Sequence, residues 1–228
     1  MLSSTILFNE SMANHTSFGI GGLADCFAYP NDRNELSTLL QFANKENIKT
    51  FFIGSGSNIL VWDKGFNGIV ISLQKTFKKY TITKDLKIIA ESGVMLGTLV
   101  KEAIRSQISG LESLIGVPGT LGGALIMNAG AFGSEISNYF EEALTMNLTG
   151  DIIKYTKKQI NFYYRNSSFP NNEMLIEATF QGKPGLRKQI QEDRKKASLN
   201  RKLNQPLKFR SAGSIFKNPT KELAAGYL

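Results

Sequence analysis

The chain contains almost no cysteine or histidine. Among its 228 residues there is one cysteine, Cys26, and one histidine, His15. A lone cysteine excludes an internal disulfide framework and a multi-cysteine metal site. A lone histidine leaves no histidine cluster for a metal and argues against a histidine-based catalytic triad. We therefore expect no metal site, with Cys26 filling core space and His15 acting as a turn or packing residue.

The chain also lacks a recognisable leader and a membrane-crossing run. The first ten residues, MLSSTILFNE, contain no basic residue and only a brief apolar run, so no signal peptide is expected. The segment 109–133 is apolar, but Glu112 and several glycines interrupt it, which argues against a membrane span. These absences predict a soluble cytoplasmic protein without membrane insertion.

Acidic residues are fewer than basic ones. The 27 Lys and Arg residues exceed the 19 Asp and Glu residues and give a net charge of +8. This excess favours anionic partners such as nucleic acid, an acidic membrane surface or phosphorylated small molecules. The basic segment 187–202 lies on a predicted helix and has no aromatic residue among its charges. That pattern is typical of a solvated helix face, so no nucleic-acid partner is expected.

The apolar pattern predicts an α+β chain whose 42% hydrophobic content can build a sizeable core. A helix opens at Asn31-Asp32, with Glu35 placed as in a capping box, and its apolar stripe is Leu36, Leu39, Leu40 and Ala43. Strands at 24–30 and 50–53 flank this helix in a βαβ-like unit. A turn at 65–68 leads to a strand at 69–73.

Further elements are predicted along the rest of the chain. The strands are two hairpins, 80–83 with 86–91 (turning at Lys84-Asp85) and 143–148 with 152–155, and a strand at 174–180. One helix has Leu96, Leu99, Val100, Ala103 and Ile104 on its apolar face, and Gly110 is placed to end it. A second, short helix is expected to be capped by residues 156–159. A third begins at Pro184 with Leu186, Ile190 and Ala197 on its apolar side, and a fourth begins near Thr220.

Two glycine-rich segments are candidates for binding a cofactor. GSGSN at 54–58 follows the predicted strand 50–53, and GVPGTLGG occupies 116–123. Small residues after a buried strand can form a nest of N–H groups for a pyrophosphate, and glycine lets the backbone approach a ligand closely. The known nucleotide fingerprints fail, because G-x-G-x-x-G would require glycine at Ile59 and no Gly-Lys-Ser/Thr follows. A tight structural loop remains the alternative for 116–123.

Five ordered motifs, spread over nearly the whole chain, resemble those of the UDP-N-acetylenolpyruvoylglucosamine reductase family. They are NHTSFGIGG at 14–22, GSGSNILV at 54–61, GVPGTLGGALIMNAGA at 116–131, YRNS at 164–167 and SAGSIFKNP at 211–219. The resemblance implies a two-lobed FAD-binding domain of the vanillyl-alcohol-oxidase/PCMH type, with lobes at 1–73 and 74–183. A shortened α+β substrate-binding domain at 184–228 is expected to follow.

The resemblance also implies a reaction. NADPH reduces non-covalently bound FAD, and hydride then passes to the enolpyruvyl double bond of a UDP-sugar, giving UDP-N-acetylmuramate for peptidoglycan synthesis. The expected cofactor-binding residues are Gly54, Ser55, Gly56, Ser57, Asn58, Val117, Pro118, Gly119, Gly122 and Gly123.

Hydride addition to this alkene spreads negative charge onto the adjacent carboxylate, which cationic donors can stabilise before a protic group quenches the carbon. The resemblance assigns Arg165 as the carboxylate partner and Ser214 as the proton donor. Serine is a very weak acid, so a cation such as Lys217 must support its alkoxide form. Lys217 and Asn218 are expected in the substrate site.

Two departures from the family pattern stand out. Gly19 occupies a position where a larger or basic residue is expected, and no counterpart of the family's C-terminal acidic catalytic residue occurs by Leu228. The chain stops within the apolar pattern of the helix predicted near Thr220, which suggests truncation, so weak or no turnover is expected of it alone. The alternatives are a truncated FAD-binding remnant without catalysis and another PCMH-type flavin oxidase, in which His15 or Cys26 would attach the flavin.

Overall fold

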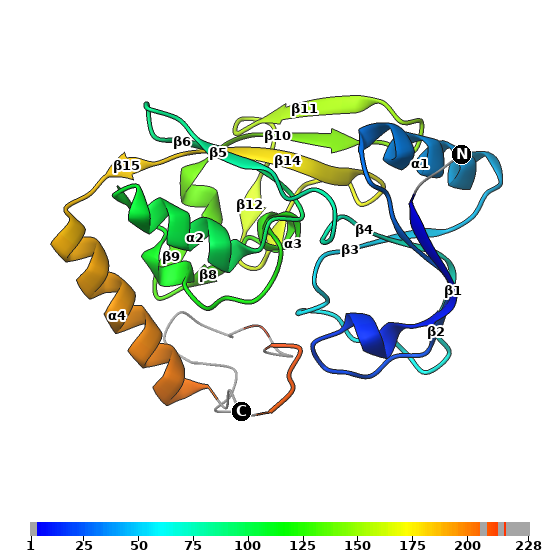
Figure 1. The fold of residues 1–228 in the computed structure, drawn as a ribbon, viewed down its shortest axis with the longest axis horizontal. Helices are drawn as coiled ribbons and strands as arrows, with labels where there is room; N and C mark the ends of the chain where they lie inside the picture. The colour runs from blue at the N-terminus through cyan, green and yellow to red at the C-terminus, as the bar shows by residue number, and fades with distance from the viewer. Residues whose placement is uncertain (1–3, 206–208, 214–216, 218–228) are drawn as a thin grey trace.

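The computed structural model describes residues 4–205, 209–213 and 217. Ser214, Asn218 and the helix predicted from near Thr220 lie outside the described residues. Within them, strands build two main sheets, and Figure 1 shows these side by side, with the first sheet toward the N-terminal end of the colour scale. The predicted α+β class is confirmed by this mixture of helices and sheets.

The first sheet has four strands in the order β1-β2-β4-β3. They are β1 (Thr5–Ser11), β2 (Leu23–Tyr29), β3 (Thr50–Ile53) and β4 (Phe66–Ser72). β4 pairs in parallel with both β2 and β3, whereas β1 pairs antiparallel to β2. The predicted βαβ-like unit is therefore present, but β4 lies between its two strands.

The helix of this unit, α1 (Arg33–Lys45), forms where its capping pattern predicts. The Asp32 carboxylate accepts a hydrogen bond from the Glu35 N–H at 2.9 Å, and the Glu35 carboxylate accepts one from the Asn31 N–H at 2.9 Å. This reciprocal arrangement satisfies N–H groups that a helix start leaves open. The whole predicted apolar stripe is buried: Leu36, Leu39, Leu40 and Ala43.

The turn predicted at 65–68 is wrong in its length. Gly65, with φ +75°, makes the turn and donates its N–H to the Trp62 carbonyl at 2.8 Å. Phe66 is already the first residue of β4 and is paired with Ala24 of β2. Pairing with the neighbouring strand therefore extends β4 backward into residues that look like a turn on local criteria.

The second sheet has five strands in the order β11-β10-β14-β6-β5. They are β5 (Tyr80–Ile82), β6 (Lys87–Glu91), β10 (Phe140–Met146), β11 (Ile152–Thr156) and β14 (Met174–Gln181). All neighbours in this sheet pair antiparallel, and both predicted hairpins are confirmed as β5–β6 and β10–β11.

Two helix predictions need correction in this part of the chain. α2 (Leu96–Arg105) ends before Gln107, which takes the positive φ of +57° that Gly110 was expected to supply. Of the residues predicted to cap a short helix, 156–159, Thr156 ends β11 and 157–159 form a turn, because the Gln159 side chain accepts hydrogen bonds from the N–H and hydroxyl of Thr156. Local side-chain bonding replaces the helical hydrogen bonds there.

Short elements complete the chain. They are η1 (Met12–His15), β7 (Ile108–Ser109), η2 (Glu112–Leu114), α3 (Leu121–Ile126), β8 (Gly130–Ala131), β9 (Ser134–Glu135), η3 (Ile136–Tyr139), β12 (Phe162–Tyr163), β13 (Asn166–Ser167) and β15 (Lys183–Pro184). α2 and α3 share one apolar core with the second sheet, while Met146, Met174 and Ile176 of that sheet pack in the same cluster as α1. The second sheet is thus joined to the first through α1.

The last described helix is α4 (Arg187–Asn204), which lies beside α2 and η2 (Figure 1). Ile190 and Ala197 are buried as predicted, whereas Leu186 precedes the helix as its N-cap residue and is 79% exposed. The predicted place of Leu186 on the buried side is therefore wrong. Within the described residues, no helix combines the length and apolar character needed to cross a bilayer.

Candidate functional site

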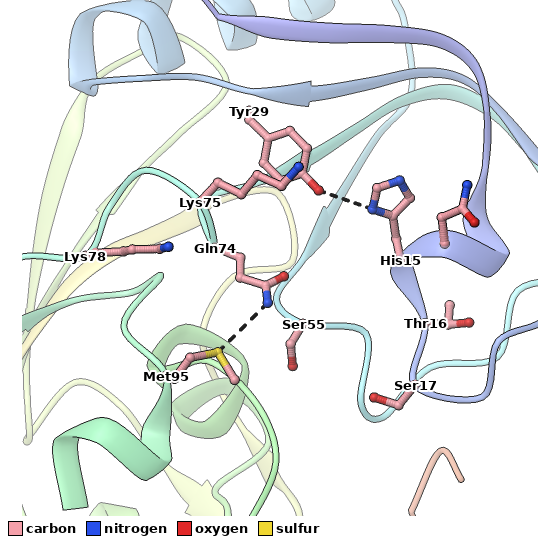
Figure 2. Close-up of a pocket in the computed structure, with 10 residues that line it drawn as sticks. His15, Thr16, Ser17, Tyr29, Ser55, Gln74, Lys75, Lys78 and Met95 are labelled. Carbon is pink, nitrogen blue, oxygen red and sulfur yellow. Dashed lines mark hydrogen bonds between the residues drawn. The ribbon is translucent and has the colours of Figure 1, made fainter. Parts of the chain in front are cut away.

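A pocket lies at one edge of the first sheet. Parallel strands end at the same edge of a sheet, and in open α/β sheets this is where ligands bind. Tyr29 ends β2, Ser55 follows β3, and Gln74 and Lys75 follow β4. All four line a pocket of about 400 Å³, drawn in Figure 2.

The remaining walls come from both parts of the molecule. Residues 14–17, at the end of η1, line one side of the pocket. Met95 also lines the pocket and is the N-cap residue of α2, a helix that packs in the core of the second sheet. Across the pocket, Gln74 Nε2 donates to Met95 Sδ at 3.9 Å (Figure 2). Lys78 adds a second ammonium group to that of Lys75. The pocket therefore lies between the two sheets and carries positive charge.

The hydroxyl of Ser55 is the one predicted cofactor contact that lines this pocket. Its Oγ is buried and has no hydrogen-bond partner among the described residues. A buried hydroxyl without a partner is costly, so such an atom in a pocket is a candidate ligand contact.

The structure brings the two glycine-rich loops together. Ser57 Oγ donates to the Pro118 carbonyl at 3.2 Å, and a Cβ on Gly119 would lie 3.4 Å from that same Oγ. A Cβ on Gly54 would collide with the Thr120 hydroxyl. Glycine is required at 54 because the second loop packs directly against this part of the backbone.

The second loop differs from the expected loop of free amides. Residues 121–126 form α3, with the Thr120 side chain as its cap accepting from the Gly123 N–H at 3.4 Å. The N–H of Gly122 donates to the Ser92 carbonyl at 2.9 Å, and that of Val117 to the Leu114 carbonyl at 3.0 Å. These three N–H groups are bonded within the protein, so this loop offers a close backbone surface more than a set of donors.

The predicted motif at 14–22 packs on the first loop. Ser17 N–H donates to the Gly56 carbonyl at 2.9 Å, and Gly56, at φ +65°, leaves no room for a Cβ beside the His15 carbonyl. The segment before Ser214 also reaches this loop, because a Cβ on Gly213 would lie 3.6 Å from Asn58 Oδ1. Motifs far apart in the sequence thus meet around residues 54–58.

Gly19 has a structural reason for lacking a side chain. It has φ +75°, and the Arg210 guanidinium occupies the space that a Cβ would take. A basic group therefore lies beside this position, supplied by residue 210.

His15 has a defined packing role, as predicted. Its ring stacks on Phe27 with centroids 3.9 Å apart, and its Nε2 lies 2.8 Å from Glu10 Oε1. Its Nδ1 lies 3.1 Å from the Tyr29 hydroxyl at the pocket (Figure 2). Hydrogen bonds from His15 and Asn14 hold the pKa of Glu10 below its ordinary range, and burial raises the pKa of Tyr29.

Sequence reasoning missed several residues that line the pocket: Tyr29, Gln74, Lys75, Lys78 and Met95. Tyr29, Gln74 and Lys75 stand at the ends of predicted strands. The rule that ligands bind at the carboxyl edge could therefore have identified them.

Arg165 is not among the residues that line this pocket. With Tyr164 it forms the two-residue turn between β12 and β13, and it adopts φ +54°. Its Nη2 donates to the Gly130 carbonyl at 2.8 Å, and its Cζ lies 4.6 Å from the centroid of the Tyr164 ring. Lys217 is exposed, and its predicted partners Ser214 and Asn218 lie outside the described residues.

Comparison with known proteins identifies the family. Residues 24–156 match the FAD binding domain family, which confirms the expected FAD cofactor. UDP-N-acetylenolpyruvoylglucosamine reductase of Carboxydothermus hydrogenoformans is 39% identical over 96% of this chain and 72% of its own length. The Clostridium novyi protein of the same name is 40% identical over 95% of this chain and 70% of its own length.

Solved structures agree with this assignment. The UDP-N-acetylenolpyruvylglucosamine reductase (MurB) of Thermus caldophilus superposes with a TM-score of 0.84 and 29% identity, covering 100% of this chain and 79% of its own. Cholesterol oxidase from Brevibacterium sterolicum has a TM-score of 0.61 at 14% identity, covering 80% of this chain and 38% of its own. At this identity the likeness supports the PCMH-type fold and says nothing of function. The chain belongs to the UDP-N-acetylenolpyruvoylglucosamine reductase family.

Proposed function

We propose that this chain uses NADPH and FAD to reduce the enolpyruvyl ether of UDP-N-acetylglucosamine enolpyruvate to UDP-N-acetylmuramate, a step of peptidoglycan synthesis. The observation that carries the proposal is the contact of the two glycine-rich loops, through Ser57 and Pro118, beside a Ser55 hydroxyl that has no partner among the described residues. Relatives named as this reductase, at 39–40% identity, support the reaction class. A cytoplasmic location remains a prediction from the sequence.

The residues of the pocket fit a dinucleotide cofactor. The Ser55 hydroxyl lacks a partner among the described residues, and the loop 54–58 presents small residues at the carboxyl edge of the sheet. We assign the cofactor diphosphate to this loop, with the ammonium groups of Lys75 and Lys78 balancing its charge. Pro118 and Gly119, which has φ +134°, lie against Ser57 of this loop and outside the pocket lining. FAD bound here supplies hydride transfer.

Arg165 is the proposed partner of the substrate carboxylate. When hydride reaches one carbon of the enolpyruvyl double bond, negative charge develops on the other carbon and on the adjacent carboxylate. A guanidinium aimed at that carboxylate stabilises the charge. The Ser214 hydroxyl is the proposed donor of the proton that completes the lactyl ether, with Lys217 stabilising the resulting alkoxide and Asn218 binding substrate.

The test begins with the absorption spectrum of the purified protein, followed by anaerobic titration with NADPH and then with the enolpyruvyl sugar. We expect a flavin spectrum that NADPH bleaches and the sugar restores. A colourless protein that takes up no FAD at saturating supply would overturn the proposal. Flavin that stays on the precipitated chain after denaturation would favour a covalent flavin oxidase instead.

Steady-state turnover distinguishes the two functional alternatives. NADPH oxidation that depends on the enolpyruvyl sugar would support the reductase. Bleaching by NADPH without reoxidation by the sugar would favour the non-catalytic FAD-binding alternative.

A further inference from the structure

The hairpin that carries Arg165 is tied to the end of α3. Ser167 Oγ donates to the Ile126 carbonyl at 2.7 Å, and Asn128 Nδ2 donates to the Tyr163 carbonyl at 2.9 Å. Each bond joins one strand of the β12–β13 hairpin to the segment around 126–128. The Arg165 turn is therefore held against the end of α3 through both strands of its hairpin.

The Arg165 guanidinium lies against the backbone of Gly130, which has no side chain. A Cβ on Gly130 would lie 3.1 Å from Arg165 Nη1 and 2.8 Å from Glu135 Cγ. Glu135 Oε1 lies 3.8 Å from Arg165 Nη1. Arg165 and Glu135 thus meet over a glycine whose missing side chain makes room for both.

Asn128 holds Glu135 in place. It is fully buried, and its Nδ2 donates to Glu135 Oε2 at 2.8 Å. One carboxylate oxygen is thereby fixed by Asn128, which leaves the other oxygen for Arg165. The 3.8 Å separation exceeds the roughly 2.7–2.9 Å of a charge-assisted hydrogen bond. Glu135 can therefore orient the guanidinium while the donors that are not bound to the Gly130 carbonyl stay available to a substrate anion.

We propose that Glu135, held by Asn128, is a positioning residue that aims Arg165 at the substrate carboxylate. The proposal rests on the role given to Arg165 under the proposed function. The substrate feature that Arg165 recognises is then the enolpyruvyl carboxylate. A UDP-sugar with this carboxylate should bind more tightly than the same UDP-sugar without it. Asn128 acts one step further away, by fixing the Glu135 carboxylate.

Two other roles for Glu135 make different predictions. A negative charge that merely lies nearby would repel the substrate carboxylate, so its removal would strengthen binding. A purely structural tie would change stability while leaving the preference between the two sugars unaltered. The positioning role alone predicts that the preference falls when the carboxylate is neutralised.

The experiment measures dissociation constants of the FAD-loaded chain for UDP-N-acetylglucosamine enolpyruvate and for UDP-N-acetylglucosamine, which has no carboxylate. Glu135→Gln keeps the size of the side chain and an oxygen that can accept from Asn128. Glu142→Gln is the matched control, because it breaks an ion pair with Lys154 (2.7 Å) that lies on β10 and β11. We expect Glu135→Gln to reduce the preference roughly tenfold and Glu142→Gln to leave it unchanged.

Unchanged or increased preference in Glu135→Gln would overturn the inference. The variant Arg165→Lys separates this failure from that of the proposed function, because it should abolish the preference if Arg165 binds the carboxylate. If the parent chain shows no preference, the proposed function fails. Crystal structures of parent and Glu135→Gln then decide the inference: a guanidinium displaced from the Gly130 carbonyl supports it, and one that stays overturns it.

Discussion

Ser57 Oγ donates a hydrogen bond to the carbonyl oxygen of Pro118 at 3.2 Å, which joins two glycine-rich loops separated by 61 positions in the chain. This bond is the direct side-chain link between the GSGSN loop of the first sheet and the GVPG turn of the second. Any ligand held by both loops depends on their spacing, and this contact helps to set it.

Ser57→Ala should therefore weaken cofactor binding more than it weakens the fold. Loss of one such hydrogen bond costs about 1 kcal/mol, so we expect the dissociation constant for FAD to rise roughly five- to tenfold. Fluorescence titration of the deflavinated protein measures this. Ser109→Ala is the matched control. Ser109 Oγ also donates to a backbone carbonyl, that of Lys183, at 3.3 Å, but neither residue lines the pocket. Equal effects of the two variants on FAD binding would contradict the expectation.

The buried hydroxyl of Ser55 predicts opposite effects on stability and binding. Ser55→Ala removes a donor that has no partner in the described protein, so the apoprotein should keep or gain up to about 1 kcal/mol of unfolding free energy. FAD binding should weaken roughly tenfold, because the cofactor loses a hydrogen bond.

Ser113→Ala provides the control for Ser55→Ala. Ser113 Oγ is also buried without a partner among the described residues, but Ser113 is absent from the pocket lining. Its replacement should affect stability in the same direction and leave FAD affinity unchanged. Urea unfolding and FAD titration of both variants distinguish the two contributions, and unaltered FAD affinity in Ser55→Ala would remove Ser55 from the site.

The pairing of Glu10 with His15 makes part of the stability depend on pH. Because hydrogen bonds lower the folded-state pKa of Glu10 below 4.5, the carboxylate stabilises the fold above the unfolded pKa. That contribution is lost as pH falls through the lowered pKa. Glu10→Gln should therefore be less stable than the parent at pH 7, and the difference should shrink below about pH 4. Urea unfolding at both pH values measures it, and a constant difference would exclude the linkage.

Local signals in the sequence were enough to predict some elements. Asp32 and Glu35 are only three positions apart in the chain, and their capping bonds need no distant partner, so α1 could be predicted from local residues alone. The early start of β4 at Phe66 could not, because its cause is pairing with β2. The strand order could not be predicted locally either, since no local signal places β4 between β2 and β3.

The candidate site also has some features that the local sequence predicts and others that depend on the packing of distant segments. Composition and motif predict 54–58 and 116–123 as candidate ligand-binding segments, but the contact between the two segments depends on the packing of the two sheets. The bonding of the Gly122 N–H to Ser92 follows from that packing too, and it removes a donor that glycine content alone suggests is free. Glu135 carries no motif signal of its own, and its place beside Arg165 appears only once the chain is folded.

Gly19 offers a test of how one position depends on a residue nearly two hundred positions away. A side chain at 19 would require φ +75°, which costs about 1–2 kcal/mol for a non-glycine residue, and it would meet the Arg210 guanidinium. Gly19→Arg should therefore be destabilised by both backbone strain and the approach of two cations. In the double variant Gly19→Arg/Arg210→Gly the backbone strain remains, but the second cation is gone. Its loss of unfolding free energy should therefore be smaller than the sum of the losses in the two single variants. A double-mutant cycle by urea unfolding measures this coupling, and strictly additive effects would show that Arg210 does not occupy the space beside residue 19.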